Sequence, residues 1–319
     1  MTPGWLILHG GALGDLMLTL QLALRLPRVA EDGLHVVSRT DPGDLSACQP
    51  KITRQSSDAL GFHWLYETNG APRPAALDRL FGGAHVLSAL GDSQSRAHER
   101  LLMLGAACVY SFDPRPRPGL NRHITQQWLT DLETQGLLIP KCIHQHPGQR
   151  GLRIRPELRA SGRQVLQGAG AAADAVLIHP GSGGRDKCWP LANFLAVGRA
   201  LQQSGLPVCF LLGPVELERR DPAELRQTAK NFPVLRCPPP HDLVAALTAA
   251  RTLIANDSGP AHLAALLGTP TVTIFGPTSA TVWRPLGAGT QTITGEPRRD
   301  PETWDVQAAQ VVSLALKCL

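Results

Sequence analysis

The sequence has no CxxC pair, and its seven cysteines are an odd number. A disulfide framework or a cysteine-based zinc site is therefore not expected, and a reducing compartment suits the chain better. The phosphate-binding motif GxxxxGK[ST] is absent, and so is the dinucleotide fingerprint GxGxxG. These absences argue against a P-loop nucleotide site and against a standard dinucleotide-binding turn.

The chain also has little surplus charge. Its formal net charge is +5, from 31 basic and 26 acidic residues in 319. Residues 1–150 carry a surplus of +1, and residues 151–319 carry +4. Nucleic-acid-binding surfaces usually need a basic stripe. The distribution therefore predicts a local anion site, such as a phosphate site, and no nucleic-acid partner.

Long hydrophobic runs are missing as well. The apolar opening WLILHGGALGDLMLTLQLALRL has no basic segment before it, and Gly10, Gly11, Gly14 and Asp15 interrupt it too early for a membrane span. We expect neither a signal peptide nor a membrane span, and hence a cytoplasmic protein. The stretch predicts a buried strand, a glycine turn and an amphipathic helix from about Asp15. The residues expected on one face of that helix are Leu16, Leu20, Ala23 and Leu24.

Strands and helices alternate in both halves of the chain. The expected strands are WLILHG, LHVVSR and HVLSALG in the first half, and AVLIHPG, PVCFLLG, TLIAND and TVTIFGP in the second. Uniformly apolar strands separated by helices predict parallel sheets that are covered on both faces. The chain is too long for one ordinary core, and a polar stretch at 141–164 separates the halves. We predict two doubly wound, Rossmann-like α/β domains, 1–150 and 151–319, which face each other across a cleft.

The stretch HPGSGGRDKCWP, residues 179–190, follows one of these strands. Gly181, Gly183 and Gly184 would allow positive φ and let backbone N–H groups approach an anion. Lys187 would add a compact positive charge at the rim of that loop. The alternative is a flexible connection that carries a surface lysine, and spacing alone does not separate the two.

A second stretch, IANDSGPAHLAALL, joins another expected strand end to a helix. Asp257 or Ser258 can cap a helix that Pro260 begins, and the N-terminus of a helix is itself an anion site. His262 falls in the first turn and could donate to the same anion. Alone, it is better interpreted as a packed core histidine. Two anion-seeking strand ends in one domain suggest a diphosphate held between two loops.

The third stretch is HGGALGDL, at the end of the first expected strand. It places Asp15 where a helix begins. That carboxylate could simply be stabilised by the helix dipole. Alternatively, it faces the ligand-binding edge of the first sheet and accepts a proton there.

These three stretches resemble glycosyltransferase family 9, the bacterial heptosyltransferases. HGGALGDLMLTLQLALRL is similar to the amino-terminal GxxGD segment of the family. HPGSGGRDKCWPLANFLAVGRAL and NDSGPAHLAALLGTPTVTIFGPTSATVWRPLG are similar to its two sugar-nucleotide segments. The three blocks occur in the family's order across nearly the whole chain. Ser258, Pro260 and Ala261 depart from the residues that family members often carry.

The resemblance implies a GT-B architecture with the donor in the carboxyl-terminal domain and the acceptor in the amino-terminal one. It implies ADP-L-glycero-D-manno-heptose as donor, a lipopolysaccharide inner-core acceptor and at most peripheral contact with the inner membrane. Asp15 takes the place of the catalytic carboxylate, and Lys187 that of the lysine on the donor phosphates. The donor-binding residues implied are Gly14, Ser182, Gly183, Lys187, Asp257, Ser258, Gly259 and His262, with Glu216 or Glu218 on the ribose.

The family's habit implies inversion at the anomeric carbon without a metal or other cofactor. The sequence offers no obvious metal site, since the paired histidines His144 and His146 have no evident partners. Two other functions keep the same fold. One is a non-catalytic nucleotide-binding module, and the other is a GT-B sugar-nucleotide epimerase, which would need further carboxylates and no acceptor.

Overall fold

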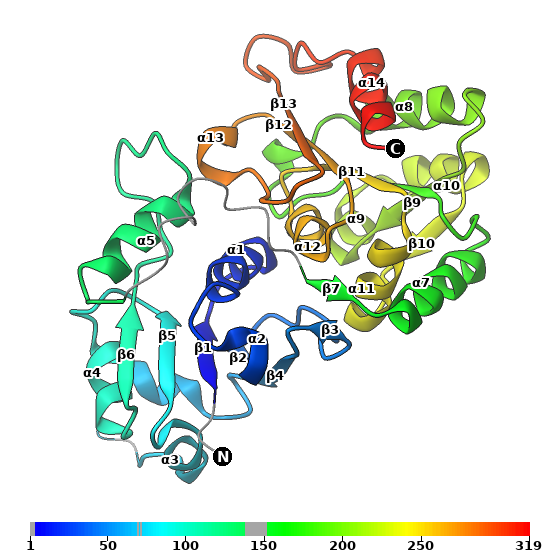
Figure 1. Cartoon of the computed structure of the whole chain (residues 1–319). Helices are drawn as coiled ribbons and strands as arrows, with labels where there is room; N and C mark the ends of the chain where they lie inside the picture. Colours follow the sequence, from blue (N-terminus) through cyan, green and yellow to red (C-terminus); the bar gives the residue numbers. More distant parts are fainter. Residues whose placement is uncertain (1–3, 69, 71, 138–151) are drawn as a thin grey trace. The chain divides into compact units, whose positions relative to one another are not determined.

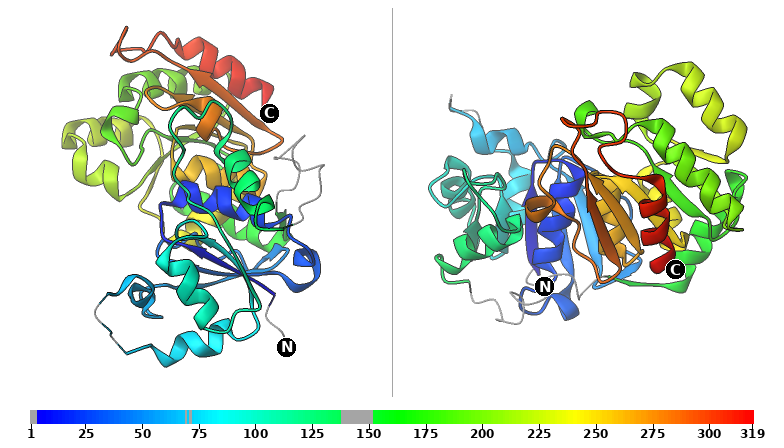
Figure 2. Two further views of the ribbon diagram at one scale, coloured as in Figure 1. Left: turned by 90° about the vertical axis from the view of Figure 1, so that its left-hand side faces the viewer. Right: turned by 90° about the horizontal axis from the view of Figure 1, so that it is seen from above.

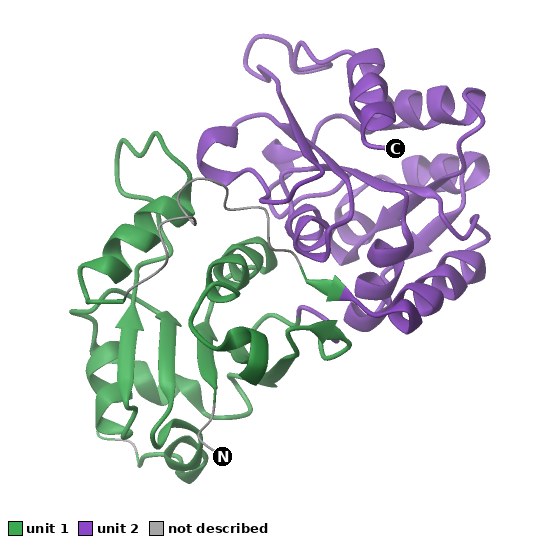
Figure 3. Cartoon of the chain, viewed as in Figure 1, with its two compact units in different colours: residues 1–41, 45–153 green, residues 42–44, 154–319 purple. Residues whose placement is uncertain are grey.

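The computed structural model describes residues 4–68, 70, 72–137 and 152–319. The chain forms two compact units (Figure 3). Unit 1 comprises Met1–Asp41 and Leu45–Arg153, and unit 2 comprises Pro42–Asp44 and Ile154–Leu319. The main change from one unit to the other therefore falls between Arg153 and Ile154. Each unit is built on its own parallel sheet.

The sheet of unit 1 has five parallel strands in the order β4-β2-β1-β5-β6 (Figure 1). The strands are β1 Trp5–His9, β2 Leu34–Ser38, β4 Ile52–Ser56, β5 His85–Ala89 and β6 Cys108–Ser111. Every residue of β1 is buried, as a central parallel strand covered on both faces requires. The strand order reverses between β1 and β5, so a ligand site is expected at their carboxyl ends.

Helices cover both faces of this sheet (Figure 2). They are α1 Leu13–Ala23, α2 Val29–Asp32, the 3-10 helix η1 Phe62–Tyr66, α3 Ala75–Phe81, α4 Arg96–Met103 and α5 Ile124–Glu133. Contacts join α1 to α5 on one side, while η1, α3 and α4 share a core with β1 on the other.

The first helix differs from its prediction in two ways. It begins at Leu13 rather than at Asp15, after Ala12, so Asp15 is its third residue. It is also not amphipathic, because every residue from Leu16 to Ala23 is buried. The expected apolar face is thus only part of a helix that is enclosed all round.

The sheet of unit 2 has six parallel strands in the order β10-β9-β8-β11-β12-β13. They are β8 Val176–His179, β9 Val208–Leu212, β10 Val234–Arg236, β11 Thr252–Asn256, β12 Thr271–Phe275 and β13 Thr290–Thr294. Renumbered along the chain, this order is 3-2-1-4-5-6, that of a dinucleotide-binding fold. The expected parallel α/β fold is confirmed in both units.

The helices of unit 2 also lie on both faces of its sheet. They are α7 Pro156–Gly168, the 3-10 helix η2 Arg185–Lys187, α8 Leu191–Gln203, α9 Pro214–Arg219, α10 Pro222–Asn231, α11 Pro240–Ala249, α12 Gly259–Leu267, α13 Ala280–Trp283 and α14 Ala308–Lys317. Helices α8 and α14 pack together on one face, and α11 contacts α7 and α12 on the other (Figures 1 and 2). A two-stranded sheet pairs β3 Cys48–Gln49 with β7 Arg153–Ile154. Among the described residues, no helix is long and apolar enough to cross a membrane.

Candidate functional site

The order of the strands in unit 2 reverses between β8 and β11, and the loops after these two strands are bound to each other. The side chain of Asn256, at the end of β11, donates from Nδ2 to the carbonyl of Pro180 at 3.0 Å. Its Oδ1 accepts the backbone N–H of Trp189 at 3.0 Å. The hydroxyl of Ser182 donates to the carbonyl of Asp257 at 2.6 Å. The glycine-rich loop is therefore held at both ends and in its middle.

Trp189 closes that loop, which explains a tryptophan at its end. The indole is fully buried and packs edge-on against Phe194 of α8, with 5.1 Å between ring centroids. Its Nε1–H donates to the carbonyl of Thr303 at 2.7 Å. The loop between β8 and α8 is thus anchored in the core of unit 2 at its carboxyl end.

The positive φ expected for the glycines of this loop is wrong, while their approach to an anion stays a prediction. None of Gly181, Gly183 and Gly184 has positive φ. Gly181 instead makes room for a side chain, because a Cβ there would lie 1.7 Å from Oε1 of Glu216. A Cβ on Gly183 would meet nothing within 4 Å. The group that lies against Gly181 in the structure is therefore a carboxylate of the same unit.

The carboxylate of Asp257 contacts three other side chains of the site. Lys187 Nζ lies 3.4 Å from its Oδ2, and the hydroxyl of Thr278 donates to the same oxygen at 2.8 Å. His262 Nε2 lies 3.7 Å from Oδ1. Burial alone would raise the pKa of Asp257, but His262, Lys187 and Thr278 together lower it below its ordinary value. Asp257 is therefore ionised at neutral pH, between a lysine and a histidine.

Two buried polar atoms beside Asp257 have no hydrogen-bond partner among the described residues. They are Oγ of Ser258 and Nδ1 of His262, which is only 4% exposed. Ser258 occupies the N-cap position of α12, but its hydroxyl makes no bond to a helix N–H. The helix begins at Gly259, with Pro260 second, so the expected cap by a side chain is wrong. Buried polar groups left unpaired in this way need a partner from elsewhere.

Glu216 is buried at the start of α9, where its Oε2 accepts the backbone N–H of Gly213 at 2.6 Å. Glu218 is exposed on the same helix. Arg220 donates to the carbonyl of Pro180 at 2.9 Å. Glu216 and Arg220 line a hollow of about 360 Å³ together with Ser182. Glu216 therefore binds the backbone of the loop after β9, whereas Glu218 is exposed to solvent.

In unit 1, Asp15 is half-buried in the first turn of α1, directly after Gly14. Its backbone carbonyl accepts the hydroxyl of Thr19 at 2.9 Å. Asp15 thus stands at the carboxyl end of β1, at the reversal of strand order in its own sheet.

The structure brings together Ser182, Lys187, Asp257, Ser258, Gly259 and His262, and adds Asn256 and Thr278, which the sequence did not single out. Thr278 follows β12, the neighbour of β11, so its place could have been found once the strand order was known.

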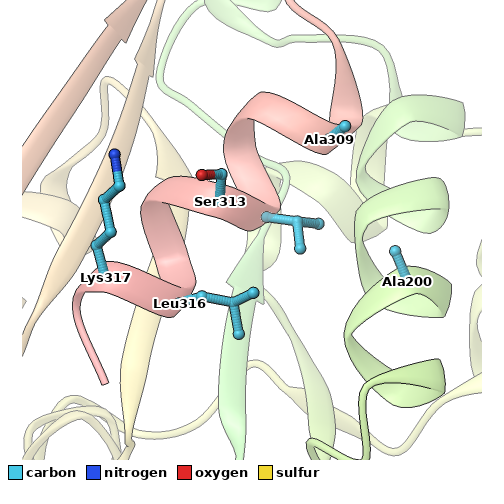
Figure 4. A pocket seen from close by; sticks show the side chains of 6 residues that line it. Ala200, Ala309, Ser313, Leu316 and Lys317 are labelled. Carbon is cyan, nitrogen blue, oxygen red and sulfur yellow. The ribbon is translucent and has the colours of Figure 1, made fainter.

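Two other features contribute no candidate chemistry. A hollow of about 550 Å³ between α8 and α14 is lined by Ala200, Ala309, Val312, Ser313, Leu316 and Lys317 (Figure 4). Among the residues that the structure describes, no three His, Cys, Asp or Glu side chains gather as metal ligands would. The pair His144 and His146 lies outside the described residues.

Comparison with protein families identifies the second half of the chain. The model of "Glycosyltransferase family 9 (heptosyltransferase)" matches residues 139–309. The lipopolysaccharide heptosyltransferase 3 of Escherichia coli is 34% identical over 126 residues, which are 39% of this chain and 37% of that protein. The same enzyme of strain K12 is 32% identical over 129 residues, with the same shares covered. The match therefore spans little more than a third of these relatives.

Solved structures share the fold over nearly the whole chain. The family 9 glycosyltransferase of Veillonella parvula DSM 2008 has a TM-score of 0.69 at 18% identity, covering 99% of this chain and 97% of that one. The E. coli heptosyltransferase WaaC with ADP has a TM-score of 0.64 at 17% identity, covering 99% of each chain. At such identities the likeness establishes the fold alone.

Proposed function

Because the chain belongs to glycosyltransferase family 9, we propose that it transfers a heptose, or a similar sugar, from an ADP-sugar to a hydroxyl of a lipopolysaccharide inner-core acceptor. The names of the E. coli relatives support the lipopolysaccharide acceptor. Solved relatives with ADP and with ADP-2-deoxy-2-fluoro heptose support the adenosine diphosphate donor. The enzyme would act in the cytoplasm, with at most peripheral contact with the inner membrane, where such a glycolipid is accessible.

One observation carries the donor site. Beside the partly exposed side chain of Lys187, the N-terminus of α12 presents two buried polar atoms, Ser258 Oγ and His262 Nδ1, that have no partner in the described part of the chain. The first N–H groups of a helix also lack partners within the helix and favour anions. A diphosphate bound here would satisfy the orphaned groups and lie against a positive charge. Gly259, the first residue of α12, has no side chain that could cover its backbone N–H group.

The reaction we propose is a single displacement. Asp15 accepts the proton of the acceptor hydroxyl, that oxygen bonds to the anomeric carbon, and the bond from this carbon to the donor phosphate breaks with its electrons on the phosphate. Attack opposite the departing group inverts the anomeric carbon. Negative charge grows on the leaving diphosphate, so Lys187 and the N-terminus of α12 stabilise the transition state more than the bound substrate. These groups supply positive charge without a metal ion.

Binding and transfer can be tested separately. A panel of ADP-, UDP- and GDP-sugars is screened by thermal unfolding, where a ligand at 100 times its Kd adds about 2.7 kcal/mol. ADP-heptose should stabilise the protein most, and sugar should then move to a deacylated lipopolysaccharide core. Binding without any turnover would support a non-catalytic module. Conversion of the donor to an isomer without an acceptor would support an epimerase.

A further inference from the structure

His9 lies behind the turn that carries Asp15. It is the last residue of β1 and is 1% exposed. Its Nδ1 accepts the backbone N–H of Gly11 at 3.1 Å. The carbonyl of Gly11 accepts the hydroxyl of Thr40 at 2.8 Å. The N–H and the carbonyl of Gly11 are therefore both bound, and they fix the turn between β1 and α1.

This hydrogen bond fixes the position of the proton on the imidazole. A backbone N–H can only donate, so Nδ1 of His9 must accept, and the neutral ring carries its proton on Nε2. Burial lowers the pKa of His9 to about 4, which leaves the ring uncharged at neutral pH. Nε2 is buried and has no partner among the described residues. His9 thus has a buried N–H group without an acceptor among the described residues, which is uncommon in natural proteins.

One oxygen of Asp15 and one edge of the His9 ring lie near the same point beside Gly11. The position that a Cβ on Gly11 would occupy lies 3.6 Å from His9 Nε2, 3.0 Å from its Cε1 and 3.4 Å from Asp15 Oδ2. Only a glycine at position 11 leaves this space free between the two side chains. His9 Nε2 and Asp15 Oδ2 therefore both lie within 4 Å of one point beside Gly11, and no hydrogen bond joins them there, because Nε2 has no partner among the described residues.

We propose that His9 is a positioning residue for Asp15, to which it donates its Nε2–H hydrogen bond when the acceptor hydroxyl is bound. The inference rests on the proposed function, in which Asp15 accepts the proton of that hydroxyl. The Nε2 proton stays on His9 throughout, and the acceptor proton goes to Asp15. A neutral donor orients the carboxylate without the positive charge that would weaken its affinity for a proton.

Two substitutions separate this role from simple anchoring of the turn. In His9→Asn, the amide oxygen reaches about as far as Nδ1 and can accept the Gly11 N–H, but no donor reaches the position of Nε2. In His9→Gln, the amide nitrogen reaches about as far as Nε2, and the Nδ1 acceptor is lost. If His9 positions Asp15, kcat at saturating donor should fall at least about 10-fold further in His9→Asn than in His9→Gln, since bonds to charged groups are the strong ones. If anchoring alone matters, the order is reversed.

Two measurements keep the result interpretable. ADP binding by calorimetry should be unchanged in both variants, because His9 lies in unit 1 and the donor groups lie in unit 2. Nitrogen-15 NMR of the histidine rings should show His9 as the neutral Nε2–H form at pH 7. An Nδ1–H form, equal kcat values or the reversed order would overturn the inference. If the unmodified protein transfers no sugar from any nucleotide donor, the proposed function fails instead.

Discussion

The ammonium group of Lys187 lies 3.4 Å from the carboxylate of Asp257, and 37% of its side chain is exposed. Asp257 is therefore a partner that holds Lys187 at the rim of the site without burying it. An incoming diphosphate can share the lysine, because Asp257 keeps Thr278 and His262 as partners. The exposed part of Lys187 can thus contact the negative charge of a ligand, and Asp257 balances the positive charge of the lysine within the protein.

Removing the charge of Lys187 should weaken use of the donor. A charge-assisted contact to phosphate contributes about 1.5–3 kcal/mol, so Lys187→Ala should lower kcat/KM for the donor roughly 10- to 150-fold. Lys317→Ala is the matched control, since Lys317 lies on α14 beside the other hollow. Steady-state kinetics with varied donor measure both. An unchanged kcat/KM in Lys187→Ala would remove this lysine from the donor site.

Gly181→Ala should destabilise the protein although it adds only one methyl group. The new Cβ would lie 1.7 Å from Glu216 Oε1, so the carboxylate must move and give up the N–H of Gly213. Overpacking of this kind costs about 1–3 kcal/mol. Gly183→Ala is the control, because its Cβ meets nothing within 4 Å. Urea unfolding of the two variants should separate them, and equal midpoints would contradict the packing role of Gly181.

The central strands could be predicted from the sequence because they are buried on both faces. β8, β9, β11 and β12 are fully buried, and each carries at least three apolar residues within four or five positions. The strands β4, β6, β10 and β13 were not predicted, and all four are edge strands. β13, with the sequence TQTIT, has a single apolar residue, Ile293, and none of its residues is fully buried. An edge strand is defined by its neighbour, which the local sequence does not contain.

The candidate site shows the same limit. Lys187, Asp257 and His262 were found because each follows a strand that the sequence reveals. The role of Asn256 depends on the loop after β8, 67 to 76 residues away along the chain. The purpose of Gly181 depends on Glu216, which belongs to another loop. Long-range contacts of this kind follow from the order of the strands and not from the spacing of residues.

Acid should destabilise the folded protein partly through His9. Burial lowers the pKa of His9 from 6.5 to about 4. Between these two pH values the imidazole is protonated in the unfolded chain and neutral in the folded protein. Stability should therefore decrease as pH falls through this window, by up to about 3 kcal/mol. His9→Gln should flatten that part of the profile in urea unfolding experiments. Asp257→Asn is the control, because the lowered pKa of Asp257 affects stability only below its ordinary value of 3.8.

Transfer activity should survive chelation of divalent metals. The charge on the leaving diphosphate would be met by Lys187 and by the N-terminus of α12, groups that belong to the protein. Activity is measured after dialysis against EDTA, with and without added Mg²⁺ or Mn²⁺. A loss of activity that either ion restores would show that a metal takes part.

Asp15→Asn should lower kcat by about 10²- to 10⁴-fold, the usual contribution of a general base. The carboxylate lies in the first turn of α1, just after the carboxyl end of β1, where we propose that the acceptor hydroxyl binds. The amide keeps the shape of the side chain and cannot serve as the base. Donor binding by calorimetry should change little, because the donor groups lie in unit 2.

The control for Asp15→Asn is Asp32→Asn, an exposed carboxylate at the end of α2 in the same unit. It should turn over at the unmodified rate. If the Asp15 variant folds, binds ADP and also turns over near that rate, Asp15 only stabilises the start of α1. The proton acceptor would then be a different residue, and His9 would have no carboxylate to position. A large loss of kcat at unchanged donor affinity instead places the base at the carboxyl end of β1, where the strand order of unit 1 reverses.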